Sequence, residues 1–316
     1  MEQSLSVLEK APKDYKGFAV IGGSGAYDIA MNLIGEVLGE LSLDTPFGKV
    51  SGIRFLGLES ATGPVAFISR HGWTGYTITA PDVNYRANIW ALKEIGTTRI
   101  LSWSGPGSVD PNFTPGDYVL PEDLIDLTSK RENTFFTGTG LGFIRQNPVF
   151  CPIMREVLVR SLEKLGADYR TGAVYAVTEG PRLETPAEVR MIKRLGGQLV
   201  GMTLAPEAFL ATELEICYHA CCYVANWAEG VKELPYRAGK LFEGMVEENL
   251  HSRVKNAVQG FADIVRETAS GLSALKERTC PCASAMERYR SAGRISSDWR
   301  TWILRPGQHS DHGGSY

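Results

Sequence analysis

The sequence lacks several features that mark other classes of protein. It contains no apolar run of the roughly 20 residues that a membrane-spanning helix needs. Neither sign of charge dominates, because 33 Lys and Arg stand against 36 Asp and Glu, for a net charge of −3. A field that attracts nucleic acid or anionic lipid is therefore not expected. Residues 1–4 also lack the basic and apolar regions of a signal peptide. We expect a cytoplasmic protein that binds neither nucleic acid nor membranes.

Cysteine is also sparse, with six residues in the chain. One apolar stretch, 216–225, holds three of them and is expected to be a buried strand with inert thiols: Cys217, Cys221 and Cys222. Cys280 and Cys282 form a Cys-Pro-Cys pair, which is compatible with a strained disulfide or with half of a metal site. No second Cys or His pair at zinc-finger spacing accompanies it. The sequence thus predicts free thiols and no metal.

The order of apolar patterns predicts the fold class. The chain has 316 residues, 43% of them hydrophobic, and strand patterns alternate with helix patterns through its second half. We expect an α/β fold with a mixed central β-sheet flanked by helices. Strands are predicted at 17–21, 36–43, 49–58, 65–69, 99–103, 172–178, 199–202 and 216–225. Helices are predicted at 84–95, 153–165, 186–195 and 206–215, with a long helical region over 235–276.

The composition changes near residue 279. We therefore predict one domain over 1–278 and an appendage or loosely ordered tail over 279–316, in which His309 and His312 are solvated.

Three segments that follow predicted strands have the composition of anion-binding loops. They are Gly-Gly-Ser-Gly at 22–25, Ser-Arg-His-Gly at 69–72, and Ser-Trp-Ser-Gly-Pro-Gly-Ser at 102–108. Glycines let backbone N–H groups approach an anion, and an Arg fork suits phosphate oxygens. A fourth segment, 201–207, contains Thr203, which is able to donate to an anion, and Glu207, which is able to accept from ribose hydroxyls. Each segment alone is also compatible with an empty turn, a surface residue or a helix cap.

A carboxylate and an amide, Glu184 and Asn226, suit a 6-oxopurine base. The N1–H of such a base donates to a carboxylate, while O6 and N7 accept from an amide NH₂. A 6-aminopurine reverses the first demand. A helix-proximal acid and a strand-end cap are the alternative interpretation of the two residues.

In this order, the segments resemble the trimeric purine nucleoside phosphorylase and methylthioadenosine phosphorylase family, from Phe18 to Asp263. The most specific stretches are Val-Asn-Tyr-Arg-Ala-Asn-Ile-Trp-Ala-Leu-Lys at 83–93, Thr-Glu-Gly-Pro-Arg at 178–182, and Met202-Thr203 followed by Pro206-Glu207. The resemblance implies phosphorolysis of purine nucleosides in purine salvage, with inorganic phosphate as co-substrate and no other cofactor. It also implies a homotrimer or a dimer of trimers.

The resemblance further implies which residues form the site. Phosphate would be held by Ser24, Arg70, His71, Ser104, the N–H of Gly105, and Thr203. The sugar would lie near Met202, with Tyr76 or Tyr85 close by. The base would lie against Leu183, with Glu184 and Asn226 on its polar edge. Arg70, Glu184 and Asn226 would therefore be the catalytic residues.

The base pocket departs from the aminopurine branch of the family, which carries aspartates where this chain has Asn226 and Ala228. We therefore expect inosine and guanosine as substrates. S-methyl-5′-thioinosine or methylthioadenosine is the alternative, which an apolar 5′ pocket from Phe242 and Met245 would favour; those two side chains equally suit a core. A nucleoside hydrolase and a binding protein without turnover are further alternatives. The phosphate-binding pattern disfavours both.

Overall fold

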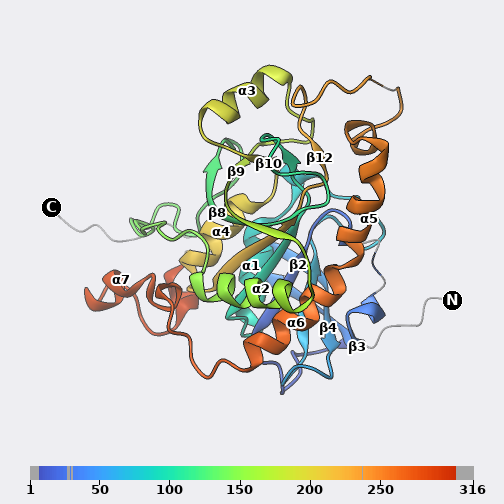
Figure 1. Cartoon of the computed structure of the whole chain (residues 1–316). Helices are drawn as coiled ribbons and strands as arrows, with labels where there is room; N and C mark the ends of the chain where they lie inside the picture. The colour runs from blue at the N-terminus through green and yellow to red at the C-terminus, as the bar shows by residue number, and fades with distance from the viewer. Residues whose placement is uncertain (1–6, 27–28, 30, 237, 304–316) are drawn as a thin grey trace.

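The structure is a computed structural model that describes residues 7–26, 29, 31–236 and 238–303. Within these residues, twelve strands form one sheet, in the order β1-β3-β4-β5-β2-β6-β11-β8-β9-β10-β7-β12 (Figure 1). The strands are β1 (Val7–Leu8), β2 (Phe18–Gly22), β3 (Glu36–Thr45), β4 (Gly48–Gly57), β5 (Val65–Ser69), β6 (Arg99–Ser104), β7 (Gly107–Ser108), β8 (Tyr118–Asp126), β9 (Tyr169–Val177), β10 (Leu199–Gly201), β11 (Cys217–Tyr223) and β12 (Asn226–Trp227).

The sheet is mixed, and helices flank it, so the predicted fold class is confirmed. Strands β5, β2, β6 and β11 are parallel, β8 pairs antiparallel with β11, and β8, β9 and β10 are again parallel. The α-helices are α1 (Tyr85–Glu94), α2 (Pro152–Lys164), α3 (Pro186–Arg194), α4 (Leu204–Glu213), α5 (His251–Gln259), α6 (Phe261–Ser273) and α7 (Glu287–Ser291). No helix in the described ranges is both long enough and apolar enough to cross a bilayer.

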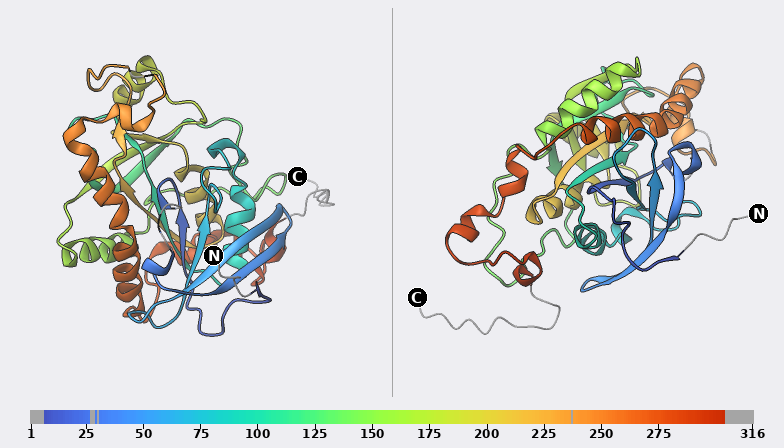
Figure 2. Two further views of the ribbon diagram at one scale, coloured as in Figure 1. Left: turned by 90° about the vertical axis from the view of Figure 1, so that its right-hand side faces the viewer. Right: turned by 90° about the horizontal axis from the view of Figure 1, so that it is seen from below.

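Strand β2 shows how the sheet is covered on both faces. All five of its residues are buried, which is typical of a central parallel strand. Phe18 and Val20 pack in the same cluster as α2 and α6, while Ala19 and Ile21 pack in the cluster of α1 and α4. Successive side chains of a strand point to opposite faces, so these helices form two outer layers around the sheet (Figure 2).

Local signals explain where two of the helices begin. Asn84 precedes α1, and its side chain accepts a hydrogen bond from the N–H of Ala87. Thr185 and Glu188 form a capping box at the start of α3, where Pro186 is already the first helical residue. Both helices were predicted to within one residue at each end. The loop before α3 is thereby fixed, and this loop carries Glu184.

Apart from three two-residue strands that were not predicted, β1, β7 and β12, two longer parts of the chain differ from their sequence prediction. Strand β8 was not predicted, because Pro121 and two acidic residues interrupt its pattern; the register with β9 shifts on both sides of Pro121. Of the long helical region predicted over 235–276, only the part from residue 251 onwards is α-helical. That region consists of two short 3₁₀ turns, η4 (Phe242–Met245) and η5 (Glu248–Leu250), followed by α5 and α6.

Residues 279–303 pack against the rest of the chain. They form the 3₁₀ turns η6 (Pro281–Ser284) and η7 (Trp299–Trp302) and the short helix α7. Met286, Tyr289 and Trp302 are buried in the same cluster as α1 and α4. Arg300 also pairs with Glu94 at the end of α1, at 2.8 Å. Residues 279–303 therefore cover part of the layer that α1 and α4 form; His309 and His312 lie outside the described residues.

Candidate active site

One cavity of about 630 Å³ is lined by most of the residues that the sequence analysis identified as candidate site residues. Its size suits a ligand of nucleoside dimensions. Ten of the predicted site residues line it: Ser24, His71, Ser104, Gly105, Leu183, Glu184, Met202, Thr203, Asn226 and Ala228. Arg70 is the exception, because its side chain is buried behind the residues that line the cavity.

Sheet topology explains why these segments meet. Ser24, His71 and Ser104 lie at or just after the carboxyl ends of the parallel strands β2, β5 and β6, which share one edge. Strands β6 and β11 then run on into β7 and β12. Gly107 of β7 pairs with both Val200 of β10 and Asn226 of β12. The carboxyl end of β10, with Met202 and Thr203, is thereby brought beside the loop that follows β6.

Two glycines are required by close approaches around the cavity. A Cβ on Gly105 would lie 2.7 Å from the hydroxyl of Tyr223. Gly180 has a φ of +73°, and a Cβ there would lie 2.6 Å from the sulfur of Met202. Only glycine relieves both the strain and the contact at Gly180. The loop that carries Leu183 and Glu184 therefore packs directly on the Met202 side chain.

His71 is held as a neutral ring. Its Nδ1 lies 2.8 Å from the carbonyl oxygen of Ile78, which only accepts, so Nδ1 carries a hydrogen. Burial, and then the charge of Arg70, lowers the pKa of His71 to about 4. In the neutral ring, Nε2 is an acceptor. An anion next to Nε2 would therefore have to donate a proton to that atom. Otherwise its negative charge would have to raise the pKa of the ring until the ring itself is protonated.

Arg70 is fully buried and paired with Glu207. The Arg70 Nε and Nη2 atoms donate to the two carboxylate oxygens of Glu207, at 2.5 and 2.8 Å. Nη2 also donates to Ser102, and Nη1 donates to the carbonyl of Trp103. Burial would lower the pKa of Arg70, but the Glu207 carboxylate raises it above its ordinary value. Glu207 thus anchors Arg70 and is not among the residues that line the cavity, which does not favour a contact with ribose hydroxyls.

Glu184 and Asn226, far apart in the sequence, line the same cavity and are only 8% and 4% exposed. One Glu184 oxygen accepts from the hydroxyl of Thr178. The Asn226 amide donates to the carbonyl of Trp227 at 2.6 Å and contacts the sulfur of Met245 at 3.8 Å. A carboxylate and an amide are therefore both available to one ligand.

Tyr175 is a buried polar residue of the site that sequence analysis did not identify. Its hydroxyl lies 2.9 Å from Ser104 Oγ, and both residues line the cavity. Burial raises the pKa of Tyr175 well above its usual range. The neutral phenol therefore orients a hydroxyl that was expected to bind phosphate. In the sequence, Tyr175 appears only as one of several apolar residues in a strand.

Arg131 is a second residue that the sequence did not reveal. It donates to the carbonyl oxygens of Thr178, Glu179, Met202 and Ala205, to the Glu179 carboxylate, and to the Tyr85 hydroxyl. Its side chain is only 2% exposed. Because it sits in a polar segment, the sequence offers no signal to separate it from a surface arginine. It ties together the two loops that carry Glu184 and Thr203.

Apolar side chains line another part of the cavity, among them Leu241, Phe242, Met245 and Val258. Phe242 and Met245 belong to η4 rather than to a long helix. Of the two tyrosines expected near the sugar, Tyr76 lines the cavity and stacks on His71, with ring centroids 4.1 Å apart. Tyr85 bonds to the carbonyl of Ala80 and to Arg131 and is not among the lining residues.

Comparison with known proteins gives consistent matches. The family model described as "Phosphorylase superfamily" matches residues 18–268. The chain is 38% identical over 279 residues to the 6-oxopurine nucleoside phosphorylase of Pyrococcus furiosus, covering 85% of this chain and 97% of that protein. It is 39% identical over 268 residues to a probable S-methyl-5′-thioinosine phosphorylase of Methanothermobacter thermautotrophicus, covering 84% and 88%.

The fold also matches a solved structure. It is similar to the crystal structure of a methylthioadenosine phosphorylase from an antarctic soil metagenomic library, with a TM-score of 0.74 and 29% identity. The alignment covers 92% of this chain and 98% of that one.

Proposed function

Because this chain belongs to the phosphorylase superfamily and is a purine nucleoside phosphorylase, we propose that its substrates are the 6-oxopurine nucleosides inosine and guanosine. Phosphate would convert them to free base and ribose 1-phosphate for purine salvage. One observation carries the proposal: Glu184 and Asn226, a buried acceptor and a buried donor, line one cavity. The assembly that the resemblance implies, a homotrimer or a dimer of trimers, is part of the same proposal.

The edge of the base decides which purine fits. The N1–H of a 6-oxopurine donates to the Glu184 carboxylate. One hydrogen of the Asn226 NH₂ bonds to the carbonyl of Trp227, and the other is directed to N7 or O6 of the base. Adenine would bring its N1 lone pair against the carboxylate. A site built to bond one edge rejects the other by roughly 10⁴-fold, because buried polar groups are left unpaired. Ala228 adds no second carboxylate with which to bind an exocyclic amine.

Phosphate has donors at the other end of the cavity. The hydroxyls of Ser24, Ser104 and Thr203 and the N–H of Gly105 line it. Arg70 contributes charge from behind the wall, with its fork held by Glu207. His71 accepts at Nε2 when neutral, which suits a phosphate that still carries one proton.

The reaction then needs no covalent enzyme intermediate. A phosphate oxygen forms a bond to the anomeric carbon as the bond from that carbon to N9 breaks and its electron pair passes to the purine. Positive charge develops on the sugar beside the phosphate, and negative charge develops on the base beside Asn226. Fixed donors that stabilise developing charge typically contribute about 10²–10³ in rate each.

A second candidate substrate, S-methyl-5′-thioinosine, is favoured by the apolar part of the cavity. Phe242 and Met245 line it, and Phe242 is 44% exposed in the single chain. An apolar wall of this kind suits a methylthio group rather than a 5′-hydroxyl. A relative that matches over most of this chain carries that name.

The test is base release from inosine, guanosine, adenosine, methylthioinosine and methylthioadenosine, each with and without phosphate. The proposal predicts phosphate-dependent cleavage of the 6-oxo substrates. Faster cleavage of methylthioinosine than of inosine would select the second candidate. Preference for either 6-amino substrate would refute the pocket assignment, and cleavage without phosphate would refute phosphorolysis.

Variants locate the base pocket. In Asn226→Asp combined with Ala228→Asp, the ratio of kcat/KM for inosine to that for adenosine should fall at least about 10²-fold, because the carboxylates repel O6 and accept from N6. Asn226→Ala is the matched control, since it removes the donor without adding an acceptor. It should lose inosine activity and gain none on adenosine. An unchanged ratio in the double variant would place the base elsewhere.

A further inference from the structure

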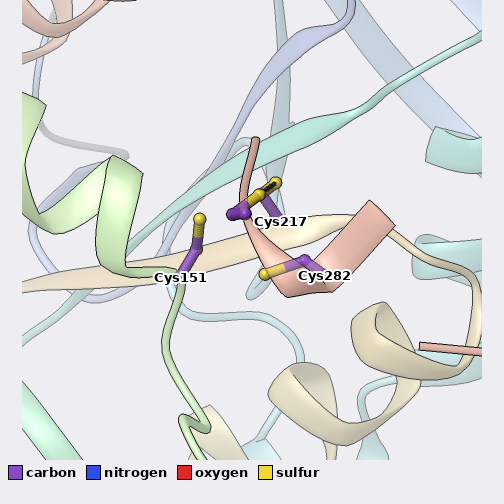
Figure 3. A group of neighbouring side chains, drawn as sticks. Cys151, Cys217 and Cys282 are labelled. Atoms are coloured by element: carbon purple, nitrogen blue, oxygen red, sulfur yellow. Dashed lines mark hydrogen bonds between the residues drawn. The ribbon is translucent and has the colours of Figure 1, made fainter. Parts of the chain in front are cut away.

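Four cysteines from three distant parts of the chain meet outside the active site. They are Cys151, Cys217, Cys280 and Cys282, whose sulfur atoms all lie within 4.8 Å of one another. Figure 3 shows Cys151 at the start of α2, Cys217 on β11 and Cys282 on η6, with their side chains converging. Three of the residues are buried and Cys282 is partly buried. None of them lines the cavity.

The backbone positions these residues independently of the sulfurs. The N–H of Cys151 donates to the carbonyl of Tyr218 at 2.9 Å, which ties the start of α2 to β11. The N–H of Cys217 donates to the carbonyl of Thr98 at 2.9 Å, at the amino end of β11. Arg278 Nη2 donates to the carbonyl of Glu215 at 2.6 Å, which holds the segment just before Cys280 against the same strand end. The cluster is therefore built into the fold.

The expectation of free thiols rested on spacing along the sequence. Cys280 and Cys282 have no partner pair nearby in the chain, but the fold supplies one from residues 151 and 217. Cys217 is thus separated in role from Cys221 and Cys222, whose sulfurs stay outside the cluster and whose burial raises their pKa. Only the latter two fit the interpretation of inert strand thiols.

We propose that these four cysteines bind one zinc ion in a closed tetrahedral tetrathiolate site. Four thiolates about 2.3 Å from zinc lie about 3.8 Å from one another, which is compatible with the spread of the sulfurs here. Thiolate is a soft ligand that selects zinc over harder cations, and tetrahedral sulfur sites are typical of zinc. With all four positions taken by protein, no place remains for water or substrate, so the site is structural.

Zinc binding at this cluster transfers protons but no electrons. On binding, the four thiols release their protons to solvent and zinc keeps its charge, so no electrons are transferred. Pairing the same thiols as two disulfides would instead require an oxidant to take two electrons for each bond.

Zinc here would join the appendage to the catalytic domain. Cys280 and Cys282 belong to the segment after residue 278, Cys151 starts a helix of one outer layer, and Cys217 starts a central strand. The other end of that strand leads to Asn226 in the cavity. The metal would therefore act on the stability of the chain without contacting substrate.

The experiment measures zinc in the full-length protein purified under reducing conditions. The proposal predicts one zinc per chain and at least a tenfold lower content in Cys151→Ser and Cys282→Ser. Cys221→Ser, a buried cysteine on the same strand as Cys217, is the matched control and should keep the metal. Wild-type protein that stays metal-free after incubation with zinc, or Cys151→Ser and Cys282→Ser variants that retain zinc, would overturn the proposal.

A second measurement does not depend on the folding of any variant. Wild-type protein stripped with a chelator is titrated with Co²⁺, which should give the intense visible absorption of tetrahedral cobalt thiolate and should be displaced by zinc. Removing the metal should lower the Tm and leave the KM for nucleoside unchanged. Absence of the cobalt spectrum, or a non-reduced mass showing two disulfides in the zinc-treated chain, would refute the site.

Discussion

The buried pair of Arg70 and Glu207 allows a sharp test of how the wall of the cavity is stabilised. The two side chains are 0% and 2% exposed, and Glu207 also accepts from Tyr218 at 2.8 Å. Glu207→Gln keeps the size of the side chain but leaves the guanidinium charge buried without its counter-charge. Breaking one partner of such a pair costs about 3–5 kcal/mol in the free energy of unfolding. That is a large part of the roughly 5–15 kcal/mol by which proteins are stable.

The same helix provides a matched control. Glu213 on α4 is buried too, but its carboxylate accepts only from neutral groups, the N–H of Phe135 and the hydroxyl of Thr134, and burial raises its pKa to about 7. Glu213→Gln should therefore cost only about 1–2 kcal/mol, the scale of individual hydrogen bonds. Because both variants make the same chemical change on one helix, the difference between them isolates the contribution of the ion pair.

The assay is urea unfolding followed by circular dichroism, with a double variant to close the cycle. Arg70→Met combined with Glu207→Gln removes the stranded charge and should recover at least about 2 kcal/mol relative to Glu207→Gln alone. A loss below about 1 kcal/mol for Glu207→Gln, or no recovery in the double variant, would refute the assignment of a buried, paired Arg70.

Three further predictions follow from single contacts. The pKa of buried His219 is lowered by burial to about 4, so the unfolded chain binds its proton first as pH falls. This group alone then lowers the free energy of unfolding by about 1.4 kcal/mol per pH unit between roughly pH 6.5 and 4. His71, whose pKa is also lowered to about 4, contributes a similar slope, so His219→Gln should remove about half of the combined slope of the two histidines in acid-unfolding curves. Gly260→Ala would place a Cβ 2.3 Å from the Tyr118 hydroxyl, and this contact should lower the free energy of unfolding by about 1–3 kcal/mol. Adding Tyr118→Phe removes the hydroxyl and should restore much of that loss in thermal melts. A double variant that stays as unstable as Gly260→Ala would contradict the clash. Arg131→Met frees four carbonyls and should lower kcat/KM about 10²-fold with a native circular dichroism spectrum, whereas an active variant would show that Arg131 does not hold Met202.

The sequence predicted those elements whose pattern is uniform along their length. Strand β5 is apolar in its first four residues, and its bounds were predicted as they occur. Strand β8 was missed because Pro121 shifts its register and its second half is polar. The 235–276 region has helical composition but contains Pro235 and several glycines, so tertiary contacts decided its shape. A local sequence pattern therefore predicts a helix or strand correctly only where the same composition or periodicity continues through the whole segment.

Much of the site was predictable because its residues follow strand ends. Ser24, Ser104 and Thr203 each lie at or after such an end, and all line the cavity. The partners of those residues were not predictable. Glu207 and Arg131 bond to groups far away in the sequence, and neither has a local pattern that reveals its partner. The four-cysteine cluster was missed for the same reason, since proximity between residues 151 and 280 arises only from the complete fold.

The packing of residues 279–303 has a consequence for synthesis on the ribosome. Met286, Tyr289 and Trp302 cover a layer whose other members, such as Trp90 on α1, are made some two hundred positions earlier. That apolar surface stays uncovered until residues 286–302 leave the exit tunnel, and a nascent chain with exposed apolar surface is prone to aggregate. A gene that ends at residue 278 would produce a chain whose apolar layer is never covered. Expression plasmids should therefore encode at least residues 1–303.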